Sequence, residues 1–101
     1  QLQQDCRDAG ATLIAECGDR ERVSVSGTLR AVSLRPLAGV PALEAELWDG
    51  SGRLALVWLG RRRIAGVEPG RGVVAYGRIT MADGQRTIFN PRYELRPLGS
   101  E

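Results

Sequence analysis

The stretch LWDGSGRL, residues 47–54, decides the fold of this 101-residue chain. Its centre, Asp49-Gly50-Ser51-Gly52, consists of the residue types that a tight hairpin turn requires. The flanking segments Leu43–Trp48 and Arg53–Leu59 are short alternating or β-branched runs, as strands are. The stretch therefore predicts two antiparallel strands joined by a short turn.

Three more segments have the composition of strands. They are short, alternating or β-branched, and bounded by Gly, Pro or Asp: Arg22–Val32, Gly72–Ile79 and Arg86–Leu95. Ala82-Asp83-Gly84 predicts a second hairpin, and Arg61–Pro69 leaves room for one short helix or turn. Five strands with this connector are typical of a five-stranded OB-fold Greek-key barrel, whose main rival is the SH3-like barrel. We predict an all-β OB-fold barrel over residues 22–96.

The first seventeen residues have a helical pattern instead. Their small and apolar residues recur at steps of three and four: Leu2, Cys6, Ala9, Leu13 and Cys17. We predict an N-terminal amphipathic α-helix and link over residues 1–21, and a C-terminal tail over residues 97–101. On one helix the two thiols would lie about 16 Å apart, too far for a disulfide, and reduced cysteines indicate a cytoplasmic protein.

Composition argues against most catalytic chemistry. All 14 basic residues are Arg, and the absence of His excludes a His-containing triad and a His-ligated metal site. The sequence contains no phosphate-binding loop, since no glycine-rich run is followed by Lys. No apolar run is long enough to span a membrane, and the first residues do not have the pattern of a signal peptide. We therefore expect no enzyme activity, no cofactor, no metal and no membrane contact.

Charge is unevenly distributed. Residues 1–50 hold 5 Arg and 8 acidic residues, a net charge of −3, whereas residues 51–101 hold 9 Arg and 4 acidic residues, a net charge of +5. The formal total of +2 therefore conceals a basic half, which is compatible with a nucleic-acid surface.

Three sequence segments of the chain resemble those of a known family. Val23–Leu29 resembles its first strand, with Gly27 at the bend, Leu47–Leu54 its Asp-Gly-Thr-Gly hairpin, and Pro69–Arg78 its fourth strand. Asn90–Leu95 also has a counterpart. The chain thus resembles bacterial OB-fold nucleic-acid-binding domains of the anticodon-binding type, especially the wedge domain of RecG-type helicases. The resemblance covers about residues 22–96 and implies binding of single-stranded DNA, tRNA or branched DNA, although some such domains bind only proteins.

Strand alternation separates an inner from an outer set of side chains in the central hairpin. The inner set is Leu43, Ala45, Leu47, Leu54, Leu56 and Trp58, and the outer set is Glu44, Glu46, Trp48, Arg53, Ala55 and Val57. Phe89, like Trp58, is expected in the core. The two outer glutamates oppose a phosphate track on this face because like charges repel.

Seven side chains are the predicted nucleic-acid contacts. They are Arg30, Arg35, Trp48, Arg53, Tyr76, Arg78 and Arg86. Arginine donates bidentate hydrogen bonds to phosphate, and an exposed aromatic ring stacks on any base. The alternative for each arginine is a solvated side chain whose stem covers apolar surface. For Arg61-Arg62-Arg63, a phosphate clamp and a solvated connector with one arginine paired to Glu68 both remain open.

Two functions follow from these residues. The first is low-specificity binding of single-stranded or structured DNA or RNA by a cytoplasmic, bacterial OB domain. The second is a protein-interaction or self-associating module that docks through Glu44, Glu46, Ala55, Val57 and the N-terminal helix. The acidic outer face of the second strand favours the second function, and the basic half of the chain favours the first.

Overall fold

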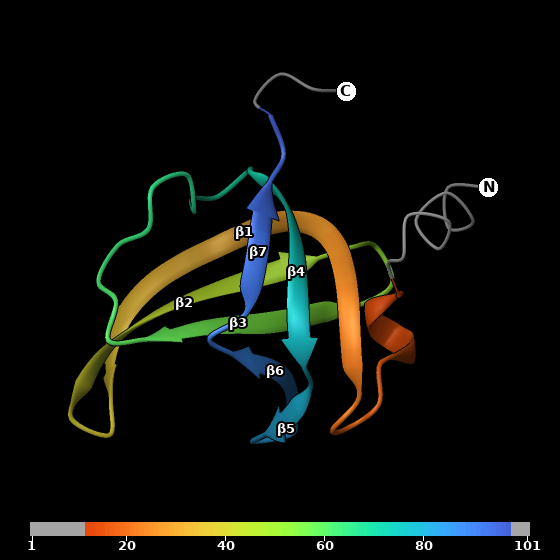
Figure 1. Ribbon diagram of the computed structural model, residues 1–101, viewed down its shortest axis with the longest axis horizontal. Coiled ribbons are helices and arrows are strands. Elements are labelled where there is room, and N and C mark those ends of the chain that lie inside the picture. The colour runs from red at the N-terminus through yellow and green to blue at the C-terminus, as the bar shows by residue number, and fades with distance from the viewer. Residues whose placement is uncertain (1–11, 98–101) are drawn as a thin grey trace.

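The computed structural model describes residues 12–97. Their elements are one short 3₁₀ turn, η1 (Ile14–Glu16), and seven strands in a single sheet (Figure 1). The strands are β1 (Arg22–Leu37), β2 (Val40–Trp48), β3 (Arg53–Leu59), β4 (Gly72–Arg78), β5 (Thr80–Ala82), β6 (Gln85–Phe89) and β7 (Arg92–Leu95). Within these residues no helix is long and apolar enough to cross a membrane.

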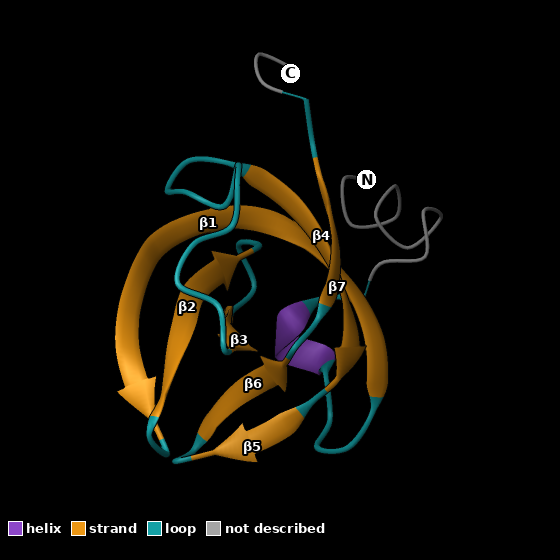
Figure 2. Ribbon diagram, turned by 60° about the vertical axis from the view of Figure 1, so that its left-hand side comes forward, coloured by secondary structure: helices purple, strands orange, loops and turns teal. Residues whose placement is uncertain are grey.

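The long strand β1 curls the sheet into an OB-like barrel (Figure 2). Its Arg22–Thr28 part pairs with β4, and its Thr28–Leu37 part pairs with β2. A Cβ atom on Gly27 would lie 2.5 Å from the Trp48 carbonyl oxygen, so only glycine lets β1 pass this close to β2 where it changes partner. The strand order is β5-β6-β3-β2-β1-β4-β7, and the chain from β6 into β7 joins the two sides of the sheet.

The expected count of five strands is wrong for two reasons. One predicted strand is divided into two, and the structure contains one strand that was not predicted. The segment Arg86–Leu95 divides at Asn90, which has a φ of +53°, and at Pro91, which has no N–H to donate. The first part, β6, pairs in parallel with β3, and the second part, β7, pairs with β4. The additional strand, β5, pairs with β6 across the predicted Ala82-Asp83-Gly84 hairpin.

The predicted N-terminal α-helix is also wrong where it can be compared. Residues 1–11 lie outside the described residues, and from Thr12 onward the chain forms only the three-residue turn η1 between extended residues. The Ile14 N–H donates to Asp49 Oδ2 at 2.9 Å, and the Ala15 N–H donates to Ser51 Oγ at 3.1 Å. The hairpin turn that follows β2 therefore takes hydrogen-bond donors that a helix would have used.

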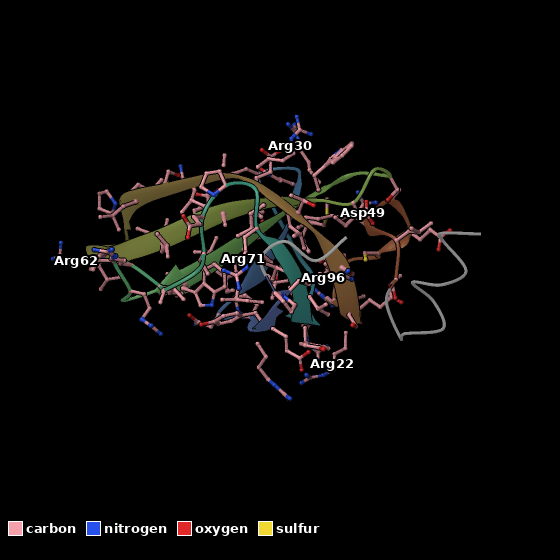
Figure 3. The ribbon with its side chains drawn as sticks, turned by 90° about the horizontal axis from the view of Figure 1, so that it is seen from above. Arg22, Arg30, Asp49, Arg62, Arg71 and Arg96 are labelled. Carbon is pink, nitrogen blue, oxygen red and sulfur yellow. The ribbon has the colours of Figure 1, made fainter. Side chains whose placement is uncertain are left out.

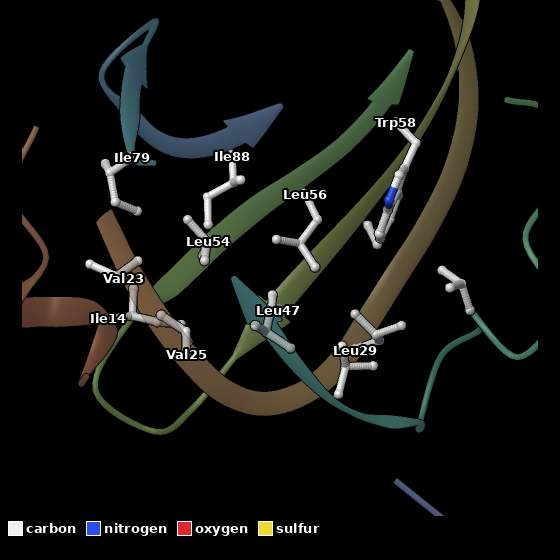
Figure 4. Packing of buried hydrophobic residues seen from close by; sticks show 14 of the residues in the cluster. Ile14, Val23, Val25, Leu29, Leu47, Leu54, Leu56, Trp58, Ile79 and Ile88 are labelled. Atoms are coloured by element: carbon white, nitrogen blue, oxygen red, sulfur yellow. The ribbon is translucent and has the colours of Figure 1, made fainter. Parts of the chain in front are cut away.

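The core lies between the two sides of the curled sheet (Figure 4). The predicted inner set of the central hairpin is confirmed, because each of its six members is buried. Ile14 from η1 and Ile79 and Ile88 from the C-terminal half complete the packing. Trp58 donates its indole N–H to the Pro91 carbonyl oxygen at 3.3 Å, which satisfies its polar atom inside the core.

Candidate nucleic-acid interface

A groove lies on the outer face of β2 and β3, beside the β5–β6 hairpin. One cavity of about 120 Å³ is lined by Arg35, Ala55, Val57 and Phe89 among others, and a shallower one beside it shares Arg35 and reaches Arg53. Ala55 and Val57, predicted to form an exposed docking surface, are instead buried in the groove floor. The reason is that β6 pairs with β3 at both positions, which places taller neighbours beside two short side chains.

Phe89 is a wall of this groove and not a core residue. Ile88 takes the inward position on β6 and is buried, so alternation turns the next residue outward. The Phe89 side chain is 38% exposed. The prediction that this ring fills the core was wrong because the strand was assigned without its register.

Two predicted arginines cover the acidic residues of β2. Arg35 Nη2 lies 2.8 Å from Glu44 Oε1, and the side chains are 62% and 24% exposed respectively. Arg53 Nη1 lies 3.8 Å from Glu46 Oε2, with exposures of 70% and 29%. The arginine side chains are thus more exposed than the glutamate side chains. Exposed ion pairs of this kind contribute at most about 1 kcal/mol, so a phosphate can compete for the arginines.

The charges of the groove are close to balance. Arg35 and Arg53 face Glu44 and Glu46, and Asp83 lies in the wall. The groove is therefore not a strongly positive channel. Its basic character is confined to its outer layer, where the arginines stand above their acidic partners.

Trp48 and Arg30 form a stacked pair beyond the Arg53 end of the groove. The Arg30 guanidinium carbon lies 4.9 Å from the centroid of the indole ring, and Trp48 is 43% exposed. Trp48 is the register partner of Arg53, so the pair adjoins the outer arginine layer. A bulge between Leu29 and Ala31 redirects the Arg30 side chain, which extends away from the body of the molecule (Figure 3).

Asp49 holds the turn behind Trp48. Its carboxylate accepts hydrogen bonds from the Ser51 N–H at 2.9 Å, the Ser51 hydroxyl at 2.7 Å and the Gly52 N–H at 3.1 Å, in addition to the one from Ile14. The backbone role that the sequence predicts for this aspartate is therefore present. The network fixes the end of β2 from which the Trp48 ring projects.

Two predicted contacts, Arg78 and Arg86, bind the protein's own backbone. Arg86 donates from Nε to the Cys17 carbonyl oxygen at 2.9 Å and from Nη2 to the Ala15 carbonyl oxygen at 3.1 Å. Arg78 donates from Nη1 to the Arg20 carbonyl oxygen at 3.0 Å. Both arginines anchor the segment before β1, and neither is grouped with Arg30 and Trp48.

Tyr76, the remaining predicted contact, lies on another face of the barrel. It is half-buried on the outer side of β4 and is the register partner of Arg92, whose guanidinium carbon lies 6.0 Å from the ring centroid. Arg92 was absent from the predicted site because nothing in the sequence shows that β7 pairs with β4. The outward alternation of Arg22 with Ser24 and Ser26 was, by contrast, a usable signal for a residue that was overlooked.

Other chemistry is scarce in residues 12–97. No group of three or more His, Cys, Asp or Glu side chains there could hold a metal ion. The buried Cys17 thiol has a raised pKa, first because burial disfavours the thiolate and second because the charge of Glu21 is nearby. Such a thiol is a weak nucleophile at neutral pH.

The barrel topology and its groove define an OB-like β domain. The structure is similar to that of RecG bound to a three-way DNA junction, with a TM-score of 0.69, 20% identity, and coverage of 88% of this chain and 13% of that chain. It is also similar to the HINb domain of p204, with a TM-score of 0.71, 14% identity, and coverage of 90% and 49%. At these identities the likeness shows the fold alone. No protein-family model and no curated protein matches the sequence.

Proposed function

We propose that this chain is a non-catalytic nucleic-acid-binding domain that holds single-stranded or structured DNA or RNA with low sequence specificity. The observation that carries the proposal is the half-exposed Trp48 ring with Arg30 at 4.9 Å, next to the outward guanidinium groups of Arg53 and Arg35. The arginines would bind phosphates while an unpaired base stacks on the indole. The bacterial and cytoplasmic setting is part of this proposal and rests on the sequence alone.

Low specificity follows from the kind of contacts available. Stacking on an aromatic ring tolerates every base, and guanidinium–phosphate contacts carry no sequence information. The structural neighbour RecG is seen with a DNA junction, which agrees with a nucleic-acid ligand for this fold. Both acidic residues of β2 are compatible with the proposal because Arg35 and Arg53 stand between them and a ligand.

Fluorescence anisotropy with a labelled 20-nucleotide single strand tests the proposal. Trp48→Ala should weaken binding by about 5- to 150-fold, because stacking contributes about 1–3 kcal/mol per base. Met81→Ala is the matched control, since Met81 has the same exposed fraction of 43% and does not line the groove. The control should bind like the wild type. Absence of binding in 50 mM salt, or binding that is indifferent to salt, would refute the proposal.

A protein partner or a second copy of the chain is the second candidate. The observation that favours it is the β1–β2 hairpin, where Leu34 and Val40 are exposed and line a shallow hollow with Arg62. Light scattering should then show a dimer that Val40→Ser converts to a monomer. A monomer at every concentration, with oligonucleotide binding intact, would leave only the first candidate.

A further inference from the structure

The outer face formed by the first half of β1, β4 and β7 gathers arginines, and it is called the arginine face below. Its basic members are Arg22, Arg71, Arg78, Arg92 and Arg96. Backbone pairing places four of them: Arg22 is opposite Arg78, Tyr76 is between Ser24 and Arg92, and Arg96 donates its backbone N–H to the Gly72 carbonyl oxygen at 2.8 Å. Arg71, directly before β4, donates from Nε to the Arg96 carbonyl oxygen at 2.8 Å. From Arg78 to Gly72 the face extends about 20 Å along β4.

We propose that the arginine face is a second binding surface for the phosphodiester backbone of nucleic acid, separate from the β2–β3 groove. The inference rests on the proposed function and extends it to a part of the barrel that the groove does not include.

Within the described part of the chain, no ion pair neutralises the arginines of this face, although three of them also donate a hydrogen bond to the protein itself: Arg71 to the Arg96 carbonyl oxygen, Arg78 to the Arg20 carbonyl oxygen and Arg96 to Ser26 Oγ. Each of these guanidinium groups keeps further N–H groups for a ligand. Two acidic side chains lie on or directly flank these three strand segments, Glu94 on β7 and Glu21 before β1, against five arginines. The ion pairs found among residues 12–97 are those of Arg35 and Arg53, in the groove. The face therefore carries a net positive charge, whereas the groove is close to balance.

Arg22 and Arg78 are cross-strand neighbours in register. Like charges directly opposite each other in a sheet destabilise it, so this pair is not explained by folding. Arg78 is held by its hydrogen bond to the Arg20 carbonyl oxygen, while Arg22 is exposed beside it. An anionic ligand that bridges the two guanidinium groups would remove the repulsion.

The arginine face lacks the exposed large apolar side chains that the core of a protein interface usually contains. The exposed large apolar side chains of residues 12–97 are Leu34, Val40, Trp48, Leu59, Met81 and Phe89. None of them lies on β4, on β7 or on the part of β1 that pairs with β4. Binding there depends on charge and on the Tyr76 ring, which are the elements of a sequence-independent nucleic-acid contact.

The two surfaces point in different directions. Figure 3 shows Arg22 and Arg30 on opposite sides of the barrel, with Arg71 and Arg96 between them in this view. The inner sides of both sheet halves are packed into the same core, so their outer sides face away from each other. Variants of the two surfaces can therefore be compared without direct contact between the altered residues.

The test compares Arg22→Gln/Arg92→Gln with the wild type and with the charge-matched pair Arg61→Gln/Arg62→Gln, which removes the same charge from the connector after β3. The side chains of Arg22 and Arg92 take part in no hydrogen bond or ion pair found among residues 12–97. Anisotropy titrations at several salt concentrations would use the full chain with a labelled single strand and, separately, a labelled duplex. The salt slope is the slope of the logarithm of the binding constant against the logarithm of the salt concentration. Loss of two phosphate contacts should make this slope less steep by about 1.8 on duplex or by about 1.4 on single strand. The oligonucleotide on which the change occurs is the form that the face binds.

At 0.1 M salt the loss on duplex corresponds to about 60-fold weaker binding, and the Arg61/Arg62 control should lose much less. Arg22→Lys/Arg92→Lys should keep most of the salt slope because it keeps the charge. A Gln variant whose slope equals that of the wild type, or falls no more than that of the Arg61/Arg62 pair, would overturn the arginine face while leaving the groove proposal standing. A wild-type chain that binds neither oligonucleotide, or binds only anionic phosphatidylserine vesicles, would refute both.

Discussion

Replacing Arg86 by Gln should weaken the fold and leave nucleic-acid binding unchanged. Arg86 donates one part-buried and one exposed hydrogen bond, to Cys17 and Ala15, and glutamine is too short to make both. Charge-assisted hydrogen bonds contribute about 1.5–3 kcal/mol, and the exposed one should contribute less, so a loss of about 2 kcal/mol is expected. For a domain of this size that loss lowers the melting temperature by about 8–16 °C.

The assay pairs a thermal melt followed by circular dichroism with a salt titration on the labelled single strand. Arg53→Gln is the contrasting variant, because its guanidinium is 70% exposed and only 3.8 Å from its acidic partner. It should lose less than about 1 kcal/mol of stability but reduce the salt slope by about 0.7. If Arg86→Gln melts like the wild type, or reduces the slope as Arg53→Gln does, the structural role of Arg86 is wrong.

Three further predictions concern residues that support the fold around the site: Gly27, Asp49 and Cys17. Gly27→Ala should cost about 1–3 kcal/mol in thermal melts, because its Cβ would meet the Trp48 carbonyl oxygen at 2.5 Å; Gly18→Ala, whose Cβ meets only a side-chain oxygen at 3.5 Å, should cost almost nothing. Asp49→Ala should lower the free energy of unfolding in urea by about 2–3 kcal/mol, since three backbone N–H groups lose their acceptor. Burial raises the pKa of Cys17, so in a Cys6→Ser background the folded thiol should react with a disulfide reagent more slowly than the unfolded one. The contribution of the protonated thiol to the free energy of unfolding is complete below the pKa of the unfolded state, and it is lost as the pH rises through the higher pKa of the folded state. A folded thiol that titrates at or below its ordinary pKa would contradict this prediction.

The central hairpin could be predicted because its information is local. The turn residues Asp49-Gly50-Ser51-Gly52 and the period-two alternation beside them predicted the two strands and their inward side chains, and β3 begins and ends where expected. The burial of the outward Ala55 and Val57 was not predicted, because it depends on β6. Alternation needs only neighbours in the sequence. The same reasoning correctly placed Trp58 inside the barrel and Trp48 outside.

The C-terminal and N-terminal segments could not be predicted in this way, because long-range contacts decide them. The chain divides at Asn90, whose Oδ1 accepts the Leu59 N–H at 2.9 Å and whose own N–H donates to the Val57 carbonyl oxygen at 2.6 Å. These contacts exist only once β6 lies beside β3. Similarly, Ile14 leaves the helical pattern because Asp49, 35 residues away, binds its backbone N–H.

The candidate site was predicted by residue type but not by grouping. Arg30, Arg35, Trp48 and Arg53 do lie on one side of the barrel, because β1, β2 and β3 pair as neighbours. Whether an arginine is free for a ligand depends on which carbonyl groups surround it, and the sequence cannot show that Arg86 is occupied by Cys17 and Ala15. Periodicity identifies which side of a strand a residue takes, and only the fold identifies its neighbours.

Both proposed surfaces depend on the single strand β1. Its first half supplies Arg22 to the arginine face, and the residues after its change of partner supply Arg30 and Arg35 to the other side. Gly27 lies at that change of partner, so it sets the direction of one surface relative to the other. If one nucleic acid occupies both surfaces, Gly27→Ala should weaken binding by more than its effect on folding explains. If the two surfaces bind separately, the folded Gly27→Ala variant should keep the wild-type salt slope for each surface.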